Sequence, residues 1–304
     1  MKQPVANYGD SVRARLLAIA NREHLQLEYL LLRYAVERFL WRLGKSRYAD
    51  RFILKGASAF AVWTGLFGRM TRDADFAAFG EPDSQKLIAA FKDVCAIPCP
   101  SDAVVFDQGS FQSESIKKGD GYPGTRIRFT ATIGGAHVAL QFDIGFGDII
   151  HPFPEKMEYP ILLDGEKPLV RIYPIYAAIS EKFQVMVARG MANSRLKDYY
   201  DIWYLAEHCD IDNDVLACAI RKTFQRRGTP IPMRLPTSLT EQFYENDAKQ
   251  TQWNAFLRKM PSKSRPDSMK AVVERICALL EPIIVQLAEN SISDSVVDGD
   301  QRKV

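Results

Sequence analysis

The sequence lacks any segment that would place the protein in a membrane. No apolar run in its 304 residues reaches the roughly 18 residues that a bilayer span requires. The first residues, MKQPVANYGDSVRARL, contain no apolar region of the kind found in a signal peptide. We therefore expect a cytoplasmic protein that acts without a membrane.

The sequence also lacks the cysteine pattern of a disulfide framework or a zinc site. It has five Cys, an odd number, and none is spaced with His in the way that zinc ligands are. The nearest two form a C-x-x-x-C pair without a second pair, which is a weak metal signal. Reduced thiols of a cytosolic protein are the better interpretation. The five positions are Cys95, Cys99, Cys209, Cys218 and Cys277.

The charge balance gives little indication of a partner. The net charge is +3, so the total argues neither for nor against nucleic acid, for which local patches matter more. Apolar residues at 47% and charged residues at 25% are ordinary for a globular protein. A chain of this length can bury a sizeable core, and no internal repeat divides it. We expect two domains.

The pattern of helices and strands predicts an α+β protein whose second half is helical. Residues 1–165 are expected to form the N-terminal domain, with leading helices in 10–44 and a catalytic core in 50–150. Residues 166–290 are expected to form a helical domain and 291–304 a disordered tail. Pro282 is expected to kink the last helix. The predicted strands are 52–54, 73–79, 103–106, 125–133 and 136–144, and the predicted helices are 10–22, 25–43, 58–66, 83–95, 174–189, 195–208, 213–226, 240–259 and 266–289.

Two of these strands form the strongest local signal. Residues 125–133 and 136–144 alternate in polarity and are separated by Gly134-Gly135, which is typical of a hairpin. Asp143 lies near the end of the second run. The following segment, 145–168, is rich in Gly and Pro and has little periodicity, so we interpret it as a crossing segment.

The chain is organised around residues 52–76, which read FILKGASAFAVWTGLFGRMTRDADF. Asp73 and Asp75 are two positions apart on a strand, so their side chains project from one face. Two carboxylates together with substrate phosphates are a typical Mg²⁺ site. The turn Gly56-Ala57-Ser58 can present backbone N–H groups to phosphate at a helix N-terminus. The alternative is that the two acids cap a turn or pair with Arg69 and Arg72.

A third acid and a lysine extend this hypothesis. Asp143 could converge with Asp73 and Asp75 from a neighbouring strand and help to deprotonate an attacking hydroxyl. Lys182 lies on a largely apolar face of the predicted helix 174–189, where a lysine needs an anion such as a triphosphate. A snorkelling lysine or a simple ion pair is the equally weighted alternative.

Two further charged segments are harder to assign. Residues 195–201, RLKDYYD, carry acidic groups at a helix start, and a solvated helix terminus explains them as well as a site does. A basic set in the helical half could grip an RNA backbone, although such charge is more often solvated surface. Its members are Arg221, Lys222, Arg226, Arg227, Arg234, Arg258, Lys259, Lys263, Arg265 and Lys270.

Five separated motifs resemble, in order and approximate spacing, those of the AbiEii family. These proteins are nucleotidyltransferase toxins of abortive-infection (phage defence) toxin–antitoxin systems, with a DNA-polymerase-β-like fold. The resemblance covers about residues 45–210. The motifs are LKGASA at 54–59, TRDADF at 71–76, Asp143, SEK at 180–182 and RLKDYYD at 195–201.

The resemblance implies a role for each matching residue. Gly56 and Ser58, with Ala57 between them, match the turn that holds the nucleotide phosphates. Asp73 and Asp75 match the metal-binding carboxylates, and Asp143 the candidate general base or second metal ligand. Lys182 matches the lysine of the helical motif that contacts the triphosphate. The last motif, which the family needs for activity, is matched by Lys197, Asp198 and Asp201.

The resemblance also implies the reaction and its partners. An NTP would donate its NMP to a tRNA or protein acceptor with Mg²⁺ or Mn²⁺, and an AbiEi-like antitoxin would counteract the toxin with or without a stable complex. Ala57 and Ala74 depart from the commonest pattern, in which a second Gly and a larger apolar residue are frequent. Neither change removes a charge, so we expect an active enzyme. The alternatives are a catalytically silent nucleotide-binding regulator and a housekeeping nucleotidyltransferase.

Overall fold

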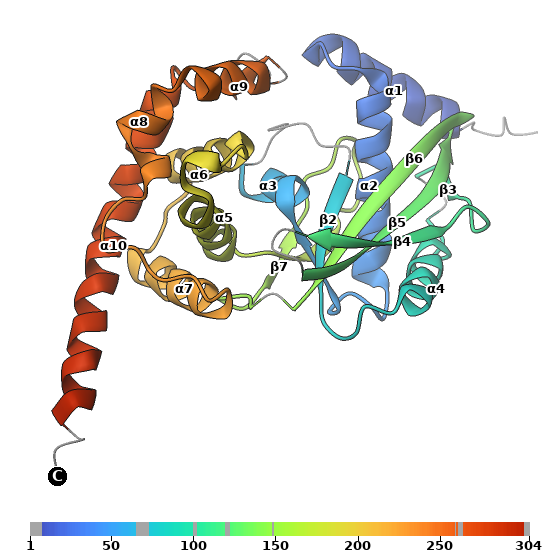
Figure 1. Ribbon diagram of the computed structural model, residues 1–304. Helices are drawn as coiled ribbons and strands as arrows, with labels where there is room; N and C mark the ends of the chain where they lie inside the picture. The colour runs from blue at the N-terminus through green and yellow to red at the C-terminus, as the bar shows by residue number, and fades with distance from the viewer. Residues whose placement is uncertain are drawn as a thin grey trace, which may run out of the picture. The chain divides into compact units, whose positions relative to one another are not determined.

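The computed structural model describes residues 8–64, 73–99, 102–118, 122–147, 149–258, 260 and 264–300 (Figure 1). The chain divides into two compact units. The first comprises residues 1–148 and 154–173, and the second comprises residues 149–153 and 174–304. Each unit is described by itself.

The first unit is built on an eight-stranded mixed sheet within the described residues. The strand order is β3-β5-β6-β2-β1-β8-β7, and β4 pairs with β5. β2 and β6 are parallel, as are β1 and β8, and the other pairs are antiparallel. The strands are β1 Phe52–Lys55, β2 Asp73–Ala78, β3 Val104–Phe106, β4 Gln112–Lys118, β5 Tyr122–Ile133, β6 Ala136–Phe146, β7 Glu155–Glu158 and β8 Leu169–Ile172.

Helices cover the apolar face of this sheet. α2 (Leu27–Lys45) packs across β5, β6 and β8, and α1 (Tyr8–Glu23) and α4 (Ser84–Cys95) pack against α2. Phe39 of α2 is fully buried at the centre, with its ring centroid 4.7 Å from that of Phe142 and 5.2 Å from that of Phe91. Such edge-on aromatic contacts add to the free energy gained by burial. The opposite face of the sheet is therefore the one left for polar chemistry.

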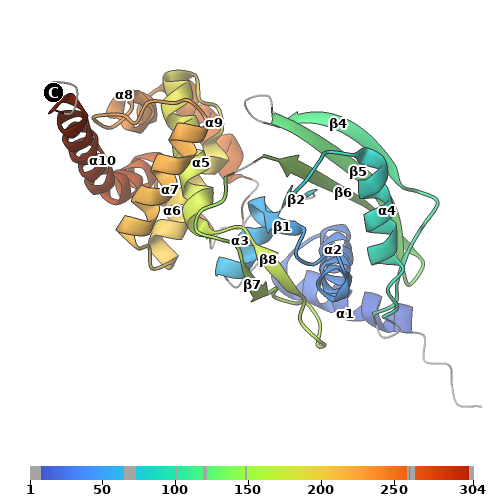
Figure 2. The same cartoon turned by 90° about the horizontal axis from the view of Figure 1, so that it is seen from below.

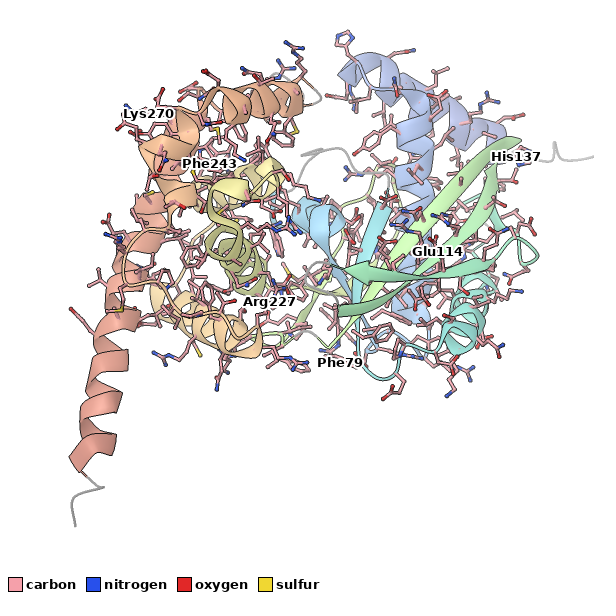
Figure 3. All side chains as sticks on the ribbon, viewed as in Figure 1. Phe79, Glu114, His137, Arg227, Phe243 and Lys270 are labelled. Carbon is pink, nitrogen blue, oxygen red and sulfur yellow. The ribbon has the colours of Figure 1, made fainter. Side chains whose placement is uncertain are left out.

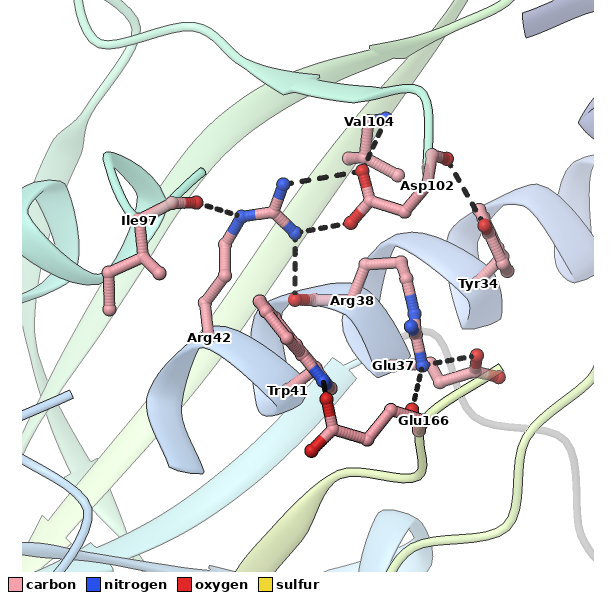
Figure 4. A network of polar contacts seen from close by, with 9 residues as sticks. All are labelled: Tyr34, Glu37, Arg38, Trp41, Arg42, Ile97, Asp102, Val104 and Glu166. Atoms are coloured by element: carbon pink, nitrogen blue, oxygen red, sulfur yellow. Dashed lines mark hydrogen bonds and ion pairs between the residues drawn. The ribbon is translucent and has the colours of Figure 1, made fainter. Parts of the chain in front are cut away.

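A buried polar network fixes α2 to the loops around it (Figure 4). Arg42 binds Asp102 through Nη1–Oδ2 at 2.5 Å and Nη2–Oδ1 at 3.3 Å, and both side chains are at most 4% exposed. The Arg42 guanidinium also donates to the carbonyl oxygens of Ile97 and Arg38. Glu37 accepts from the Leu162 backbone N–H at 2.8 Å, and burial raises its pKa to about 7 despite Arg38 beside it.

The second unit is mainly helical (Figure 2). Phe183 and Phe224, 5.4 Å apart, join α5 to α7, and Tyr199 stacks on Phe243, which is labelled in Figure 3, at 5.1 Å. α10 packs along α6 and α7. In the part of the chain that the structure describes, no helix is long and apolar enough to cross a membrane. The helices are α5 Ile175–Arg189, α6 Leu196–His208, α7 Asn213–Arg226, α8 Glu241–Tyr244, α9 Asp247–Leu257 and α10 Met269–Asp300, with 3-10 turns at Gly190–Ala192 and Thr237–Leu239.

The structure differs from the sequence prediction at three strands, β4, β7 and β8. β4 was not predicted, and β7 and β8 fall where we expected a crossing segment and the start of the helical domain. All four residues of β7 are exposed, so they carry no apolar alternation. β8 has four residues and pairs with β1, so the first unit extends to Tyr173. β7 and β8 have four residues each, too few to show a period, and β4, which reads QSESIKK, has a single apolar residue.

The last helices also differ from the prediction. The predicted helix 240–259 is two helices, because Asn246 caps α9 by accepting from the N–H groups of Ala248 and Lys249. α10 continues past Pro282 to Asp300, through most of the segment expected to be a disordered tail. Leu280 and Ile283 on either side of Pro282 are buried, and this packing stabilises the helix across the missing hydrogen bond.

Candidate active site

The sheet register brings three aspartates of the first unit onto one face. Asp75 pairs with Asp143 across the parallel strands β2 and β6, and Asp73 pairs with Gln141. Lys55, the last residue of β1, pairs with Asp75 from the other side. Residues paired in this way project their side chains from the same face of a sheet. Asp73, Asp75 and Asp143 therefore share one face of neighbouring strands, and their convergence on a metal ion stays a prediction.

Gly56 lies directly against Asp75. β1 passes into α3 (Gly56–Thr64) at Gly56, whose φ of +66° is in the left-handed region. A Cβ on Gly56 would be 2.5 Å from Oδ2 of Asp75. The first N–H groups of a helix have no intrahelical partner and favour an anion. The start of α3, with half-buried Ala57 and buried Ser58, thus lies beside a candidate metal carboxylate.

Replacing Gly56 with alanine is expected to damage activity more than stability. The left-handed conformation costs an L-residue about 1–2 kcal/mol, and the new methyl group would displace the Asp75 carboxylate. A displacement of about 1 Å can cost roughly 100-fold in rate, so we expect a loss of about that size in nucleotidyl transfer.

Gly135→Ala is the matched control for that change. Gly135 has a φ of +76°, but a Cβ there would meet no described atom within 4 Å. It therefore carries the same backbone strain without the contact with Asp75. Equal activity loss in the two variants, measured with their unfolding midpoints, would contradict the role assigned to Gly56.

Asp143 is bound by an arginine that the sequence analysis did not single out. Nε of Arg126 is 2.8 Å from Oδ1 of Asp143, and Nη2 is 3.0 Å from Oδ2. This hydrogen bonding raises the pKa of Arg126. Counting outward from the Gly134-Gly135 turn places residue 126 opposite residue 143, as the register confirms. The hairpin itself was the signal that could have identified Arg126.

The donor set fits a metal ion only in part. Among the described residues, no three His, Cys, Asp or Glu side chains are placed to hold a metal ion together. At Asp143, each of the two carboxylate oxygens accepts a hydrogen bond from Arg126. Asp73 and Asp75 supply hard oxygen donors on one face, which suits Mg²⁺ or Mn²⁺ when substrate phosphates complete the shell. The alternative partners Arg69 and Arg72 lie outside the described residues.

Lys182 in the second unit faces two aspartates of the last motif. Its Nζ is 3.2 Å from Oδ1 of Asp198 and 2.9 Å from Oδ2 of Asp201. Arg195 adds a contact from Nε to Oδ2 of Asp198 at 2.6 Å. Lys182 therefore forms an ion pair, which the sequence analysis gave as the alternative to a contact with triphosphate. Its contact with a triphosphate, and that of the exposed Lys197, stay predictions.

Burial alone would raise the pKa of Asp198, but Lys182 and then Arg195 outweigh burial and lower this pKa to about 2. A carboxyl group with a lowered pKa stabilises the fold above its unfolded pKa of about 4, and this contribution disappears as pH falls toward 2. The difference corresponds to about 2 kcal/mol. We expect the free energy of unfolding to fall by this amount between pH 4 and pH 2.

Asp198→Asn should remove this part of the pH dependence, as urea titrations at several pH values can test. Asp267→Asn is the control, since Asp267 is an exposed residue of the same unit. Retention of the full acid dependence in Asp198→Asn would show that the ion cluster contributes little to stability.

Other features of the second unit stand apart from these motifs. A cavity of about 620 Å³ is lined by Glu207, His208, Cys209, Asp210, Arg275 and neighbouring residues, none of which was predicted as a site residue. Of the predicted basic set, Arg221, Lys222 and Arg226 are exposed on α7, whereas Lys259 and Lys263 lie outside the described residues. RNA contact by this set stays a prediction.

Comparison with known proteins decides the family. A family model described as nucleotidyl transferase AbiEii toxin, type IV toxin–antitoxin system, matches residues 38–279. The chain belongs to the AbiEii family. It is therefore a nucleotidyltransferase toxin of a type IV system, as the five motifs predicted, with a nucleotide substrate and an antitoxin partner. No curated protein matches the chain.

Two solved structures resemble the AbiEii chain across most of its length. JHP933 from Helicobacter pylori is 15% identical with a TM-score of 0.50, and the match covers 90% of this chain and 99% of that one. A candidate nucleotidyltransferase from H. pylori is 16% identical with a TM-score of 0.50, covering 87% and 98%. At this identity the likeness concerns the fold, and it confirms the predicted α+β nucleotidyltransferase class.

Proposed function

We propose that this AbiEii protein transfers a nucleoside monophosphate from an NTP to a hydroxyl group of a tRNA or protein acceptor. The observation that carries the proposal is the position of Gly56 at the start of α3, where an added Cβ would be 2.5 Å from Oδ2 of Asp75. It joins the element suited to phosphate to the element suited to a divalent cation. Asp73 and Asp75 would hold Mg²⁺ or Mn²⁺, which when bound would offset phosphate charge and make the acceptor hydroxyl more acidic.

The residues of the first unit then bind and orient the reactants. Backbone N–H groups at the start of α3 would donate to phosphate oxygens, and Lys55, paired with Asp75 on β1, would add positive charge. The acceptor oxygen forms a bond to the α-phosphorus while the bond to the bridging oxygen breaks. Pyrophosphate leaves with the electron pair, and the hydroxyl proton passes to solvent. Positioning and electrostatics supply most of the catalysis in such transfers.

The biological consequence follows from the acceptor. Modification of a tRNA or of a protein needed for growth would arrest the cell, and an AbiEi-like antitoxin encoded beside the toxin would reverse the arrest. Membership of the family establishes a nucleotidyltransferase toxin. The acceptor and the metal ion are what we propose beyond it.

The test combines labelled substrate with growth. The purified protein is incubated with each of the four NTPs labelled at the α-phosphate, with Mg²⁺ and with cellular RNA or protein. We expect the label to be incorporated into either RNA or protein, and we expect EDTA to abolish this incorporation. Induced expression should stop growth, and co-expression of the neighbouring antitoxin should restore it. Transfer without growth arrest would favour a housekeeping enzyme, and nucleotide binding without transfer a silent regulator.

A further inference from the structure

We infer that Arg126 is a phosphate-binding residue of the nucleotide site and that Asp143 positions it instead of acting as a general base. This inference rests on the proposed function, because it assigns residues to the same site. It departs from the role that the family resemblance implies for Asp143. The observation behind it is the two-bond ion pair between the Arg126 guanidinium and the Asp143 carboxylate.

The position of Arg126 places its charge beside the acidic face. β5 lies next to β6, which lies next to β2, so Arg126, Asp143 and Asp75 form one row across three strands. On the other side of Arg126, Glu114 of β4 pairs with it in the sheet. Arg126 is therefore the cation that balances the carboxylates from the β5 side, as Lys55 does from the β1 side.

The Arg126 guanidinium keeps donors for a ligand. Its side chain is 26% exposed, whereas that of Asp143 is 12% exposed. Within the described residues, its hydrogen bonds to Asp143 use Nε and Nη2, and Nη1 is left for another acceptor. The planar fork of an arginine suits phosphate oxygens. A carboxylate that holds this fork in place lowers the entropy lost when phosphate binds.

The same pair engages both oxygens of the Asp143 carboxylate. Both of its oxygens accept hydrogen bonds from Arg126, so an acceptor hydroxyl would have to approach a carboxylate that already holds the guanidinium. A carboxylate in this arrangement orients its partner and keeps it charged. The competing interpretation is a cross-strand pair that only stabilises the sheet.

Three variants distinguish these roles through binding as well as turnover. Arg126→Gln should raise the Kd for a non-hydrolysable NTP analogue by about 10- to 100-fold, and that for inorganic triphosphate by a similar factor, in the absence of acceptor. Arg126→Lys should recover part of the binding, because a point charge remains. Asp143→Asn should raise the KM for NTP and leave the pH profile of kcat unchanged, since no base has been removed.

Arg171→Gln is the matched control. Arg171 is 20% exposed at its side chain and its Nε is 2.9 Å from Oδ1 of Asp50, so it resembles Arg126 but lies on β8. Its Kd for the analogue should match that of the unchanged protein. Unfolding midpoints of all variants separate lost binding from lost structure.

Specific outcomes would overturn the inference. One is an unchanged Kd in folded Arg126→Gln. Another is a drop in kcat of more than about 100-fold in Asp143→Asn while its Kd for the NTP analogue is unchanged. That result is expected when a general base is removed. Either result would leave the proposed function standing if Asp75→Asn still abolishes transfer. A wild-type protein that binds neither NTP nor triphosphate would remove both proposals.

Discussion

Replacing Asp75 with asparagine is expected to reduce nucleotidyl transfer by at least about 1,000-fold, which is roughly 4 kcal/mol of transition-state stabilisation. Asp75 pairs with both Lys55 and Asp143 in the sheet and contacts the backbone position of Gly56. Asparagine keeps the shape of the side chain but removes the charge that a divalent cation requires. The measurement is incorporation of α-labelled NTP into the acceptor at saturating Mg²⁺.

The control for this change is Glu158→Gln. Glu158 is an exposed acid on β7, at the edge of the same sheet, and pairs with Lys167. It should leave transfer within about twofold, as is usual for an exposed pair of this kind. A loss shared by both variants, or full activity in Asp75→Asn, would remove Asp75 from the chemistry. Glu114, labelled in Figure 3, is less suitable because it pairs with Arg128 near the acidic face.

Replacing Arg42 with methionine is expected to destabilise the first unit by about 3–5 kcal/mol. The change leaves the Asp102 carboxylate buried without its cation, and the carbonyl oxygens of Ile97 and Arg38 lose a donor. Methionine is also unbranched and nearly as long, so the effect reports the lost charge more than a cavity. Urea unfolding measures the free energy, and hydrogen exchange in α2 assigns the loss to this unit.

The matched control is Arg47→Met. Arg47 pairs with Asp93 at the same 2.5 Å as Arg42 with Asp102, but its side chain is 75% exposed. Water screens and competes for an exposed pair, so its loss should move the urea midpoint little. The double variant Arg42→Met/Asp102→Leu should recover much of the stability, because no buried charge is left alone. Equal effects of the two single substitutions would show that burial does not set the energy of the pair.

The candidate site could be predicted from the sequence where local spacing fixes geometry. The two-residue separation of Asp73 and Asp75 determines a shared face on any strand, and the Gly134-Gly135 turn determines the hairpin that carries Asp143. The same turn also fixed the register that brings Arg126 opposite Asp143. Pairing the residues that are equally far from the two sides of the turn would have identified Arg126 from the sequence alone.

Other features depend on contacts that no local pattern encodes. β8 has only four residues, and it forms a strand because it pairs in parallel with β1. Lys182 obtains its anions from Asp198 and Asp201, sixteen and nineteen positions later on the next α-helix. The spacing within α5 could show that Lys182 needed an anion, but only the packing of α5 against α6 shows which anions the protein supplies.

The central claim is that one NTP binds at Asp73, Asp75 and the start of α3, and the most direct measurement is a crystal structure with a non-hydrolysable NTP analogue and Mn²⁺. The account predicts an anomalous manganese peak touching the carboxylates of Asp73 and Asp75, with the triphosphate against the backbone at Gly56. Triphosphate bound instead in the cavity beside His208 and Arg275, or manganese that touches neither carboxylate, would contradict it.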